Sequence, residues 1–203
     1  MITLVLGGAR SGKSSFAENI AQKEADKDII YLATAEAKDE EMKKRIAHHK
    51  ETRPDSWKTI EEPLSVGEVL SSLPSNKTLL LDCITVLISN LLFSQNEESE
   101  TDDEKLNNEK SNGEEFVKID FQKKEKEIMA EMKKIVKASA EKDLIIVSNI
   151  VGMGIVPAHE IGRGFRDIAG RVNQYLANEA KEVYLTVAGI PVELKEISKN
   201  IID

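Results

Sequence analysis

The sequence predicts an α/β fold with a mostly parallel central sheet flanked by helices. Short runs rich in Val, Ile and Leu, with little polar alternation, indicate parallel strands that are covered on both faces. Helical patterns separate these runs along the whole chain, which is typical of right-handed strand–helix–strand crossovers. The length of 203 residues suits one such unit, and we expect a single nucleotide-binding domain over residues 1–203.

Six apolar runs are the expected strands. Five are clear, at residues 2–6, 29–33, 78–82, 144–148 and 183–187, and a shorter one lies at residues 57–60. Helical patterns are expected near residues 14–25, 38–52, 64–73, 84–94, 118–141 and 159–181.

The segment 95–115 differs from the rest of the chain in composition. Between Asn96 and Glu115, nine Asp or Glu residues stand against Lys105 and Lys110, a local charge of −7. Because it has almost nothing apolar to bury, this segment is expected to be a flexible acidic insertion. The segment could be only a solvent-exposed loop, or it could be a regulatory or partner-binding segment, and both interpretations are open.

The remaining composition argues against several classes of protein. A net charge of −8 disfavours a protein that grips nucleic acid with its whole surface. No apolar stretch reaches the roughly 20 residues of a membrane span, and the first residues lack the basic flank of a signal peptide. The single cysteine, Cys83, cannot form an intramolecular disulfide. We therefore expect a cytoplasmic protein in a reducing compartment.

A Gly-rich loop follows the first expected strand and fits the P-loop pattern for binding nucleotide phosphates. Its backbone N–H groups would surround the β-phosphate at the positive end of the next helix. Lys13 supplies a charge to the β- and γ-phosphates, which makes it a candidate catalytic residue, and Ser14 offers its hydroxyl to Mg²⁺. The candidate phosphate-binding residues are Gly7, Gly8, Ala9, Arg10, Ser11, Gly12, Lys13 and Ser14.

A magnesium partner for Ser14 is expected at the end of another strand. Asp82 ends the apolar run 78–82, and carboxylates at strand ends face the ligand edge of such sheets. Asp82 is therefore a candidate ligand of Mg²⁺ or of the nucleotide. The alternative is an aspartate that only caps the following helix. Asn149 closes the run 144–148 at the same edge.

Two of the three histidines lie in the helical pattern 38–52. Arg45, His49 and Arg53 share one stripe at spacings of four, whereas His48 lies on another side. The flanking guanidinium groups disfavour a charged His49, so a neutral imidazole could attack phosphorus while the arginines hold the phosphates. The alternative is a solvated basic helix face with two incidental histidines.

A second set of polar residues gathers on one side of the helical pattern 159–181. They are Arg163, Arg166, Asp167, Gly170, Asn173 and Gln174. The three glycines of this pattern each cost about 1 kcal/mol relative to Ala inside a helix, so something packs or binds closely there. A substrate or phosphate surface and a subunit interface are both consistent with this pattern.

Several motifs are not general to P-loop proteins, and they cover nearly the whole chain except the acidic segment. They are Tyr31-Leu32-Ala33-Thr34-Ala35, Arg45-Ile46-x-x-His49, Asp82-Cys83-Ile84-Thr85, Val147-Ser148-Asn149, Phe165-Arg166-Asp167 with Asn173-Gln174, and Ala188-Gly189-Ile190-Pro191. Together with the P-loop they closely resemble one family, the bifunctional adenosylcobinamide kinase/adenosylcobinamide-phosphate guanylyltransferases of cobalamin biosynthesis.

This resemblance implies a RecA-like P-loop fold, a homotrimer and two reactions. The first phosphorylates adenosylcobinamide with ATP or GTP. The second transfers GMP from GTP to adenosylcobinamide phosphate through a guanylyl-histidine, which the Arg-Ile-x-x-His pattern assigns to His49. Besides the P-loop, the resemblance implies GTP contacts for Ala33, Thr34, Ala35, Lys50, Glu51, Thr52, Arg53, Glu62 and Asp82.

Two departures from the family pattern stand out. Ile150 follows the Ser-Asn pair where the family commonly has Glu, and the acidic segment is longer than expected. On the residues alone two other functions stay open. One is a small-molecule kinase in which His49 only binds phosphate, and the other is a non-catalytic nucleotide-binding module that oligomerises.

Overall fold

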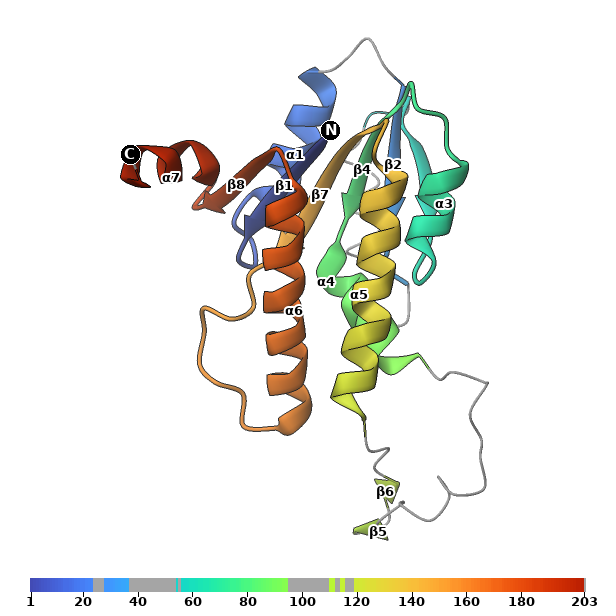
Figure 1. The fold of residues 1–203 in the computed structure, drawn as a ribbon, viewed down its shortest axis with the longest axis vertical. Helices are drawn as coiled ribbons and strands as arrows, with labels where there is room; N and C mark the ends of the chain where they lie inside the picture. Colours follow the sequence, from blue (N-terminus) through green and yellow to red (C-terminus); the bar gives the residue numbers. More distant parts are fainter. Residues whose placement is uncertain are drawn as a thin grey trace.

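The computed structural model describes residues 1–23, 28–36, 54, 56–94, 110–111, 114–115 and 119–202. At its centre is a seven-stranded sheet with the order β3-β2-β4-β7-β1-β8-β9 (Figure 1). Six strands run parallel, and β9 pairs antiparallel with β8. The strands are β1 (Ile2–Gly7), β2 (Ile29–Ala33), β3 (Lys58–Glu61), β4 (Thr78–Asp82), β7 (Asp143–Asn149), β8 (Glu182–Val187) and β9 (Ile190–Glu193).

Helices cover both faces of this sheet. They are α1 (Lys13–Lys23), α3 (Val66–Ser72), α4 (Ile84–Phe93), α5 (Phe121–Ala138), α6 (Glu160–Glu179) and α7 (Leu194–Ile202). The expected α/β class, a mostly parallel central sheet flanked by helices, is therefore confirmed. None of the helices in the described part of the chain has the length and apolarity of a membrane span.

All six expected strands are present, each within one residue of its expected ends. The edge strand β9 was not predicted, because Pro191 within it and the turn before it are typical of a loop; proline is tolerated in an edge strand. The expected helix at 38–52 lies outside the described residues. So does most of the segment 95–115, of which only the two-residue strands β5 (Lys110–Ser111) and β6 (Glu114–Glu115) are described.

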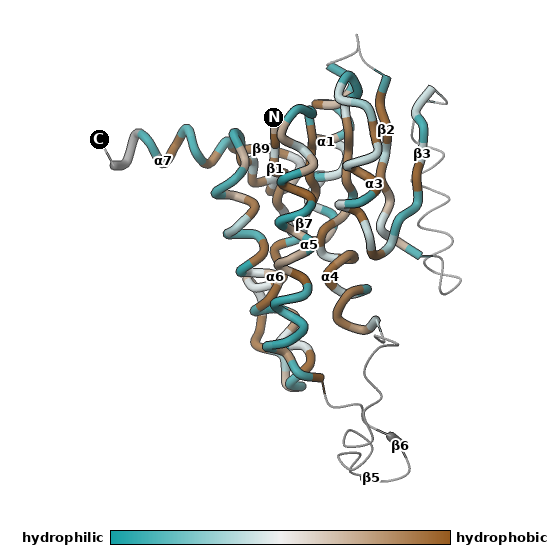
Figure 2. The backbone as a smooth tube through the Cα atoms, turned by 45° about the vertical axis from the view of Figure 1, so that its right-hand side comes forward, coloured by the Kyte–Doolittle hydropathy of each residue, from teal (hydrophilic) through white to brown (hydrophobic). Residues whose placement is uncertain are grey.

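Side chains of the strands alternate between two hydrophobic clusters, one on each face. Leu4 and Ile146 belong to the larger cluster, which is closed by α3, α4, α5 and α6. Their neighbours Val5 and Ile145 belong to the smaller cluster with α1. In Figure 2 the chain of α5 and α6 alternates between hydrophilic and hydrophobic colours, as expected of helices that cover a buried sheet.

The register of the parallel strands brings their carboxyl ends to one edge. Gly7 at the end of β1 lies opposite Asn149 of β7 and Thr186 of β8. Asp82 at the end of β4 lies opposite Ala33 of β2. Residues that are far apart in the sequence therefore share one edge, which is where parallel α/β sheets bind ligands.

Candidate active site

The Gly-rich loop connects β1 to α1 at this edge and forms a phosphate cradle, residues 7–14. Arg10 and Gly12 have left-handed backbones with φ of 55° and 89°. The loop is closed by a hydrogen bond from the Ser11 N–H to the Gly8 carbonyl at 3.3 Å. The Lys13 ammonium also donates to the Gly8 carbonyl, at 3.1 Å, so the lysine folds back over the loop. The cradle thus has the form expected for binding a phosphate chain.

The first two glycines of the cradle have different reasons to lack a side chain. A Cβ on Gly7 would collide with the Ser11 hydroxyl and lie 2.9 Å from the Thr186 carbonyl oxygen of β8. A Cβ on Gly8 would meet nothing within 4 Å. Packing of the protein itself therefore requires Gly7, whereas the space beside Gly8 is open for a ligand.

Asp82 lies at the end of β4, half-buried and beside Cys83. Burial, and then the Asp82 charge, raise the pKa of the Cys83 thiol to about 11, while the Lys13 charge acts in the opposite direction. The charges of Lys13 and Asp82 therefore both reach the Cys83 thiol, at the ligand edge of the sheet. The cap of α4 is Cys83, without a side-chain cap bond, so the alternative of Asp82 as a mere helix cap has no support.

The segment Ala33, Thr34 and Ala35 runs past Asp82 and is tightly held. The buried Thr34 hydroxyl donates to the Cys83 carbonyl at 2.8 Å and accepts from the Cys83 N–H at 3.0 Å. The Asn90 side-chain amide donates to the Thr34 carbonyl at 2.8 Å and to the Pro63 carbonyl at 3.1 Å. The Thr34 hydroxyl therefore serves the fold, because both of its hydrogen bonds go to the backbone of Cys83.

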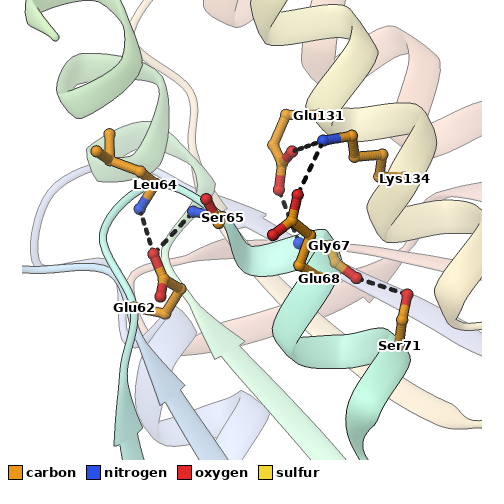
Figure 3. Close-up of polar contacts among 8 residues, drawn as sticks. All are labelled: Glu62, Leu64, Ser65, Gly67, Glu68, Ser71, Glu131 and Lys134. Carbon is orange, nitrogen blue, oxygen red and sulfur yellow. Dashed lines mark hydrogen bonds and ion pairs between the residues drawn. The ribbon is translucent and has the colours of Figure 1, made fainter.

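Glu62 lies beside the same edge, where its N–H donates to the Ala33 carbonyl at 2.9 Å. One oxygen of its carboxylate accepts from the N–H groups of Leu64 and Ser65, at 2.9 and 2.7 Å, just before α3 (Figure 3). Sequence reasoning gave Glu62 a nucleotide contact but missed this structural role. The spacing of a carboxylate two and three residues before free backbone N–H groups at a helix start is the signal that could have found it.

Glu131 of α5 is a second carboxylate that serves α3, and sequence reasoning missed it, although its place on the apolar stripe of Ile128 and Ile135 is the signal that could have found it. Its Oε1 accepts from the Gly67 N–H at 2.7 Å, and its Oε2 lies 3.6 Å from the Lys134 ammonium (Figure 3). The start of α3, next to the ligand edge, is therefore held from two sides.

Asn149 joins three elements at the middle of the edge. Its backbone N–H and its side-chain amide both donate to the Thr85 hydroxyl of α4, at 2.8 and 2.9 Å. The Asn173 amide of α6 donates to the Asn149 carbonyl at 3.1 Å and accepts from the Ser148 hydroxyl at 2.7 Å. Asn173, from the second polar set, thus holds the end of β7 from α6. Thr85 holds it from α4, and sequence reasoning did not single out this residue.

The three glycines of α6 divide into two that pack against the chain and one that lines a cavity. A Cβ on Gly162 would lie 2.8 Å from Pro157, and one on Gly164 would collide with the Phe121 ring, so both glycines serve packing within the chain. Gly170 has open space beside it and lines an open cavity of about 260 Å³. The other lining residues are Leu6, Ile150, Val151, Gly152, Asn173, Gln174 and Ala177.

Ile150, at the position where the resemblance implied a Glu, has a structural role. It packs against the larger hydrophobic cluster, and its N–H donates to the Gly7 carbonyl at 3.0 Å.

The remaining expected site residues are not placed. His49, Lys50, Glu51, Thr52 and Arg53 lie outside the described residues. Within the described ranges, no group of three or more His, Cys, Asp or Glu could hold a metal by itself.

Comparison with known proteins agrees with this arrangement. Residues 3–194 match the family model of cobinamide kinase / cobinamide phosphate guanyltransferase. The bifunctional adenosylcobalamin biosynthesis protein CobU of Escherichia coli is 39% identical over 96% of this chain and 100% of its own length. The protein of the same name from Salmonella typhimurium is 38% identical over the same shares. CobP of Pseudomonas aeruginosa is 38% identical over 96% of this chain and 98% of its own.

Solved structures resemble the chain only loosely. The flagellar accessory protein FlaH of Methanocaldococcus jannaschii aligns with a TM-score of 0.44 and 14% identity, over 91% of this chain and 70% of that one. The RadB recombinase aligns with a TM-score of 0.42 and 13% identity, over 91% of this chain and 73% of that one. The sequence relatives decide the assignment, and the chain belongs to the cobinamide kinase / cobinamide phosphate guanyltransferase family.

Proposed function

We propose that the chain phosphorylates adenosylcobinamide with ATP or GTP and then transfers GMP from GTP to the adenosylcobinamide phosphate. The observation that carries this proposal is the match to bifunctional relatives over nearly the full chain, combined with a phosphate cradle and Asp82 at one sheet edge.

The kinase step uses the cradle. The corrinoid hydroxyl oxygen attacks the γ-phosphorus and gives up its proton to solvent, the bond between the γ-phosphorus and the bridging oxygen breaks, and the nucleoside diphosphate leaves. Lys13 exchanges the Gly8 carbonyl for the phosphate oxygens and offsets their charge, and the loop N–H groups hold the β-phosphate. Positioning and charge account for most of the catalysis in such a transfer.

The second step uses His49 as nucleophile. A ring nitrogen attacks the α-phosphorus of GTP, pyrophosphate leaves, and a guanylyl-histidine forms. An oxygen of the corrinoid phosphate then displaces the imidazole, which gives adenosylcobinamide-GDP and restores the enzyme. Arg45 and Arg53, on the same stripe as His49, hold phosphates of the nucleotide.

Mg²⁺ bound to the nucleotide would take the Ser14 hydroxyl and the Asp82 carboxylate as its protein ligands and would neutralise phosphate charge. Two protein oxygens are enough, since Mg²⁺ keeps several waters and shares substrate phosphates. The Asp82 side chain fits this role, because in the described part of the chain it makes no hydrogen bond or ion pair.

Further contacts with GTP belong to the same proposal. Ala33, Thr34 and Ala35 contribute backbone groups beside Asp82, and Glu62 lies next to Ala33. The segment Lys50, Glu51, Thr52 and Arg53 completes the set. As the family resemblance implies, we also propose a homotrimer that acts in the cytoplasm.

The test is to incubate the protein with Mg²⁺ and GTP labelled at the α-phosphate. We expect a protein-bound label that is labile in acid and stable in alkali. It should be absent from His49→Ala and present in the matched control His48→Ala. Label in His49→Ala would remove the nucleophile assignment and leave a kinase. In parallel, Lys13→Ala should not phosphorylate the corrinoid, and full activity of that variant would exclude the cradle as the kinase site.

A further inference from the structure

Left-handed backbone conformations occur at only two places in the described part of the chain. Arg10 and Gly12 are in the phosphate cradle. Ala188 and Gly189, with φ of 50° and 82°, form the turn between β8 and β9. For the non-glycine residues Arg10 and Ala188 this conformation is unfavourable, and such conformations concentrate at functional sites, where the surrounding structure holds them. The second place therefore requires an explanation of its own.

The turn and the cradle are in direct contact. The Gly189 N–H donates to the Ser11 carbonyl at 2.9 Å. A Cβ placed on Gly12 would lie 3.1 Å from the Gly189 Cα, so the two backbones pack without room for a side chain. The two left-handed segments thus meet in one joint between the β8–β9 turn and the loop, through Gly189, Ser11 and Gly12.

The geometry of the turn sets this contact. Val187 pairs with Ile190, which leaves Ala188 and Gly189 as a two-residue hairpin loop. Positive φ at both positions defines a type I′ turn. Ala188 is unusual there, because the position favours Asn, Asp or Gly.

The side chains at the joint add little to it. The hydroxyls of Ser11 and Thr186 are both buried and have no hydrogen-bond partner among the described residues. The fit between the loop and β8 therefore depends on backbone shape, and so on the conformation of the turn.

The peptide unit between Ser11 and Gly12 connects the turn to the side of the loop that faces the ligand edge. In a trans peptide the carbonyl of one residue and the N–H of the next point in opposite directions. Because the Ser11 carbonyl is held by Gly189, the Gly12 N–H is directed away from the turn. Gly12 immediately precedes Lys13 and the start of α1.

We propose that the Ala188–Gly189 turn is the outer support of the phosphate cradle, and that Gly189 is a positioning residue for nucleotide binding. Its N–H fixes the Ser11–Gly12 peptide so that the Gly12 N–H faces the nucleotide phosphates. This proposal rests on the proposed function only in that the cradle binds a nucleotide.

The test compares Gly189→Ala with Gly189→Asn in the full-length protein. An added Cβ at Gly189 meets nothing within 4 Å, so Ala tests the left-handed conformation without a steric clash. Asn tolerates that conformation and is the matched control. The readouts are calorimetric binding of a non-hydrolysable GTP analogue with Mg²⁺, and the unfolding midpoint without nucleotide.

We expect Gly189→Ala to bind the analogue about fivefold more weakly or worse, and Gly189→Asn to bind within about twofold of the unmodified protein. In turnover, the KM for the nucleotide should rise in Gly189→Ala while kcat changes little. Equal binding by all three proteins would overturn the proposal. So would weaker binding in both variants that follows a lower unfolding midpoint, since that pattern indicates general destabilisation.

A measurement on the unmodified protein keeps the test independent of any variant. The Gly189 amide, although it lies in a surface turn, should be protected from hydrogen exchange by the Ser11 carbonyl. Exchange at the rate of a free amide would show that the contact is absent and would end the proposal. If the unmodified protein binds no nucleotide analogue, the proposed function itself fails, which is a different result from loss of the Gly189 effect alone.

Discussion

The two halves of the ligand edge are held in different ways. On the β2–β4 side, side-chain hydrogen bonds from Thr34 and Asn90 connect strands, a helix and a loop. On the β1–β8 side, the phosphate cradle is held by backbone contacts, and the nearby hydroxyls of Ser11 and Thr186 have no partner in the described structure. One half is a fixed platform, whereas the other can change its internal contacts. That difference suits the proposed kinase step, in which Lys13 would move from the Gly8 carbonyl to a phosphate.

The largest effect is expected where the platform is broken. Thr34→Val keeps the shape but leaves the buried N–H of Cys83 without its partner, while the Cys83 carbonyl keeps only its bond from the Leu87 N–H. The free energy of unfolding should fall by about 2.5 kcal/mol, since an unpaired buried group costs about 1–3 kcal/mol and one further hydrogen bond is lost. Urea denaturation measures this, and a loss below about 1 kcal/mol would show that the platform does not depend on this threonine.

The cradle should be sensitive to substitution at one glycine and tolerant at its neighbour. Gly7→Ala forces a Cβ into Ser11 and the Thr186 carbonyl, and should lower the free energy of unfolding by about 2 kcal/mol. Gly8→Ala has open space and should change it by less than about 0.5 kcal/mol. The same Gly8 variant should bind nucleotide more weakly, because its methyl group occupies ligand space. Equal stability of the two variants would contradict the packing shown here.

Alkaline pH should weaken the platform through Cys83. Burial and the Asp82 charge raise the pKa of its thiol from 9.0 to about 11, so the folded protein holds this proton more tightly than the unfolded chain. The resulting stabilisation is complete below pH 9 and is lost as the pH rises toward 11, by up to about 2 kcal/mol. Unfolding of the unmodified protein and of Cys83→Ala, measured between pH 8 and 11, should differ in slope. Parallel curves would refute the shift.

The smallest effect is expected at the threonine that matches Thr34 on the other half. Thr186→Val removes a buried hydroxyl that has no partner among the described residues. The free energy of unfolding should therefore stay the same or rise by about 1 kcal/mol. Opposite signs for Thr34→Val and Thr186→Val would be the clearest support for the difference between the halves. A loss at Thr186 similar to that at Thr34 would remove it.

The sequence predicted those features that depend on local pattern. The apolar runs gave all six parallel strands, because a strand buried on both faces needs a continuous apolar composition. The loop before Lys13 and the carboxylate of Asp82 were placed at one edge, because parallel strands end at the same side of a sheet.

Features that depend on contacts between distant segments could not be predicted in this way. Glu131 lies 64 residues after Gly67, and although it shares the buried stripe of α5 with Ile128 and Ile135, that stripe does not reveal its partner. Asn90 likewise gives no local sign that it binds the carbonyls of Thr34 and Pro63. The hairpin turn at Gly189 is recognisable as a turn, but its contact with Ser11 exists only once β8 has paired with β1.

The position of Lys13 has a consequence for turnover. Its ammonium is already engaged by the Gly8 carbonyl, so in the proposed kinase step an arriving triphosphate would replace an existing partner rather than meet a free cation. The same carbonyl would take the lysine back once the γ-phosphate has gone. The loop would then contain an internal competitor for the proposed ligand, and a diphosphate, which offers the lysine fewer oxygens, would be displaced more readily.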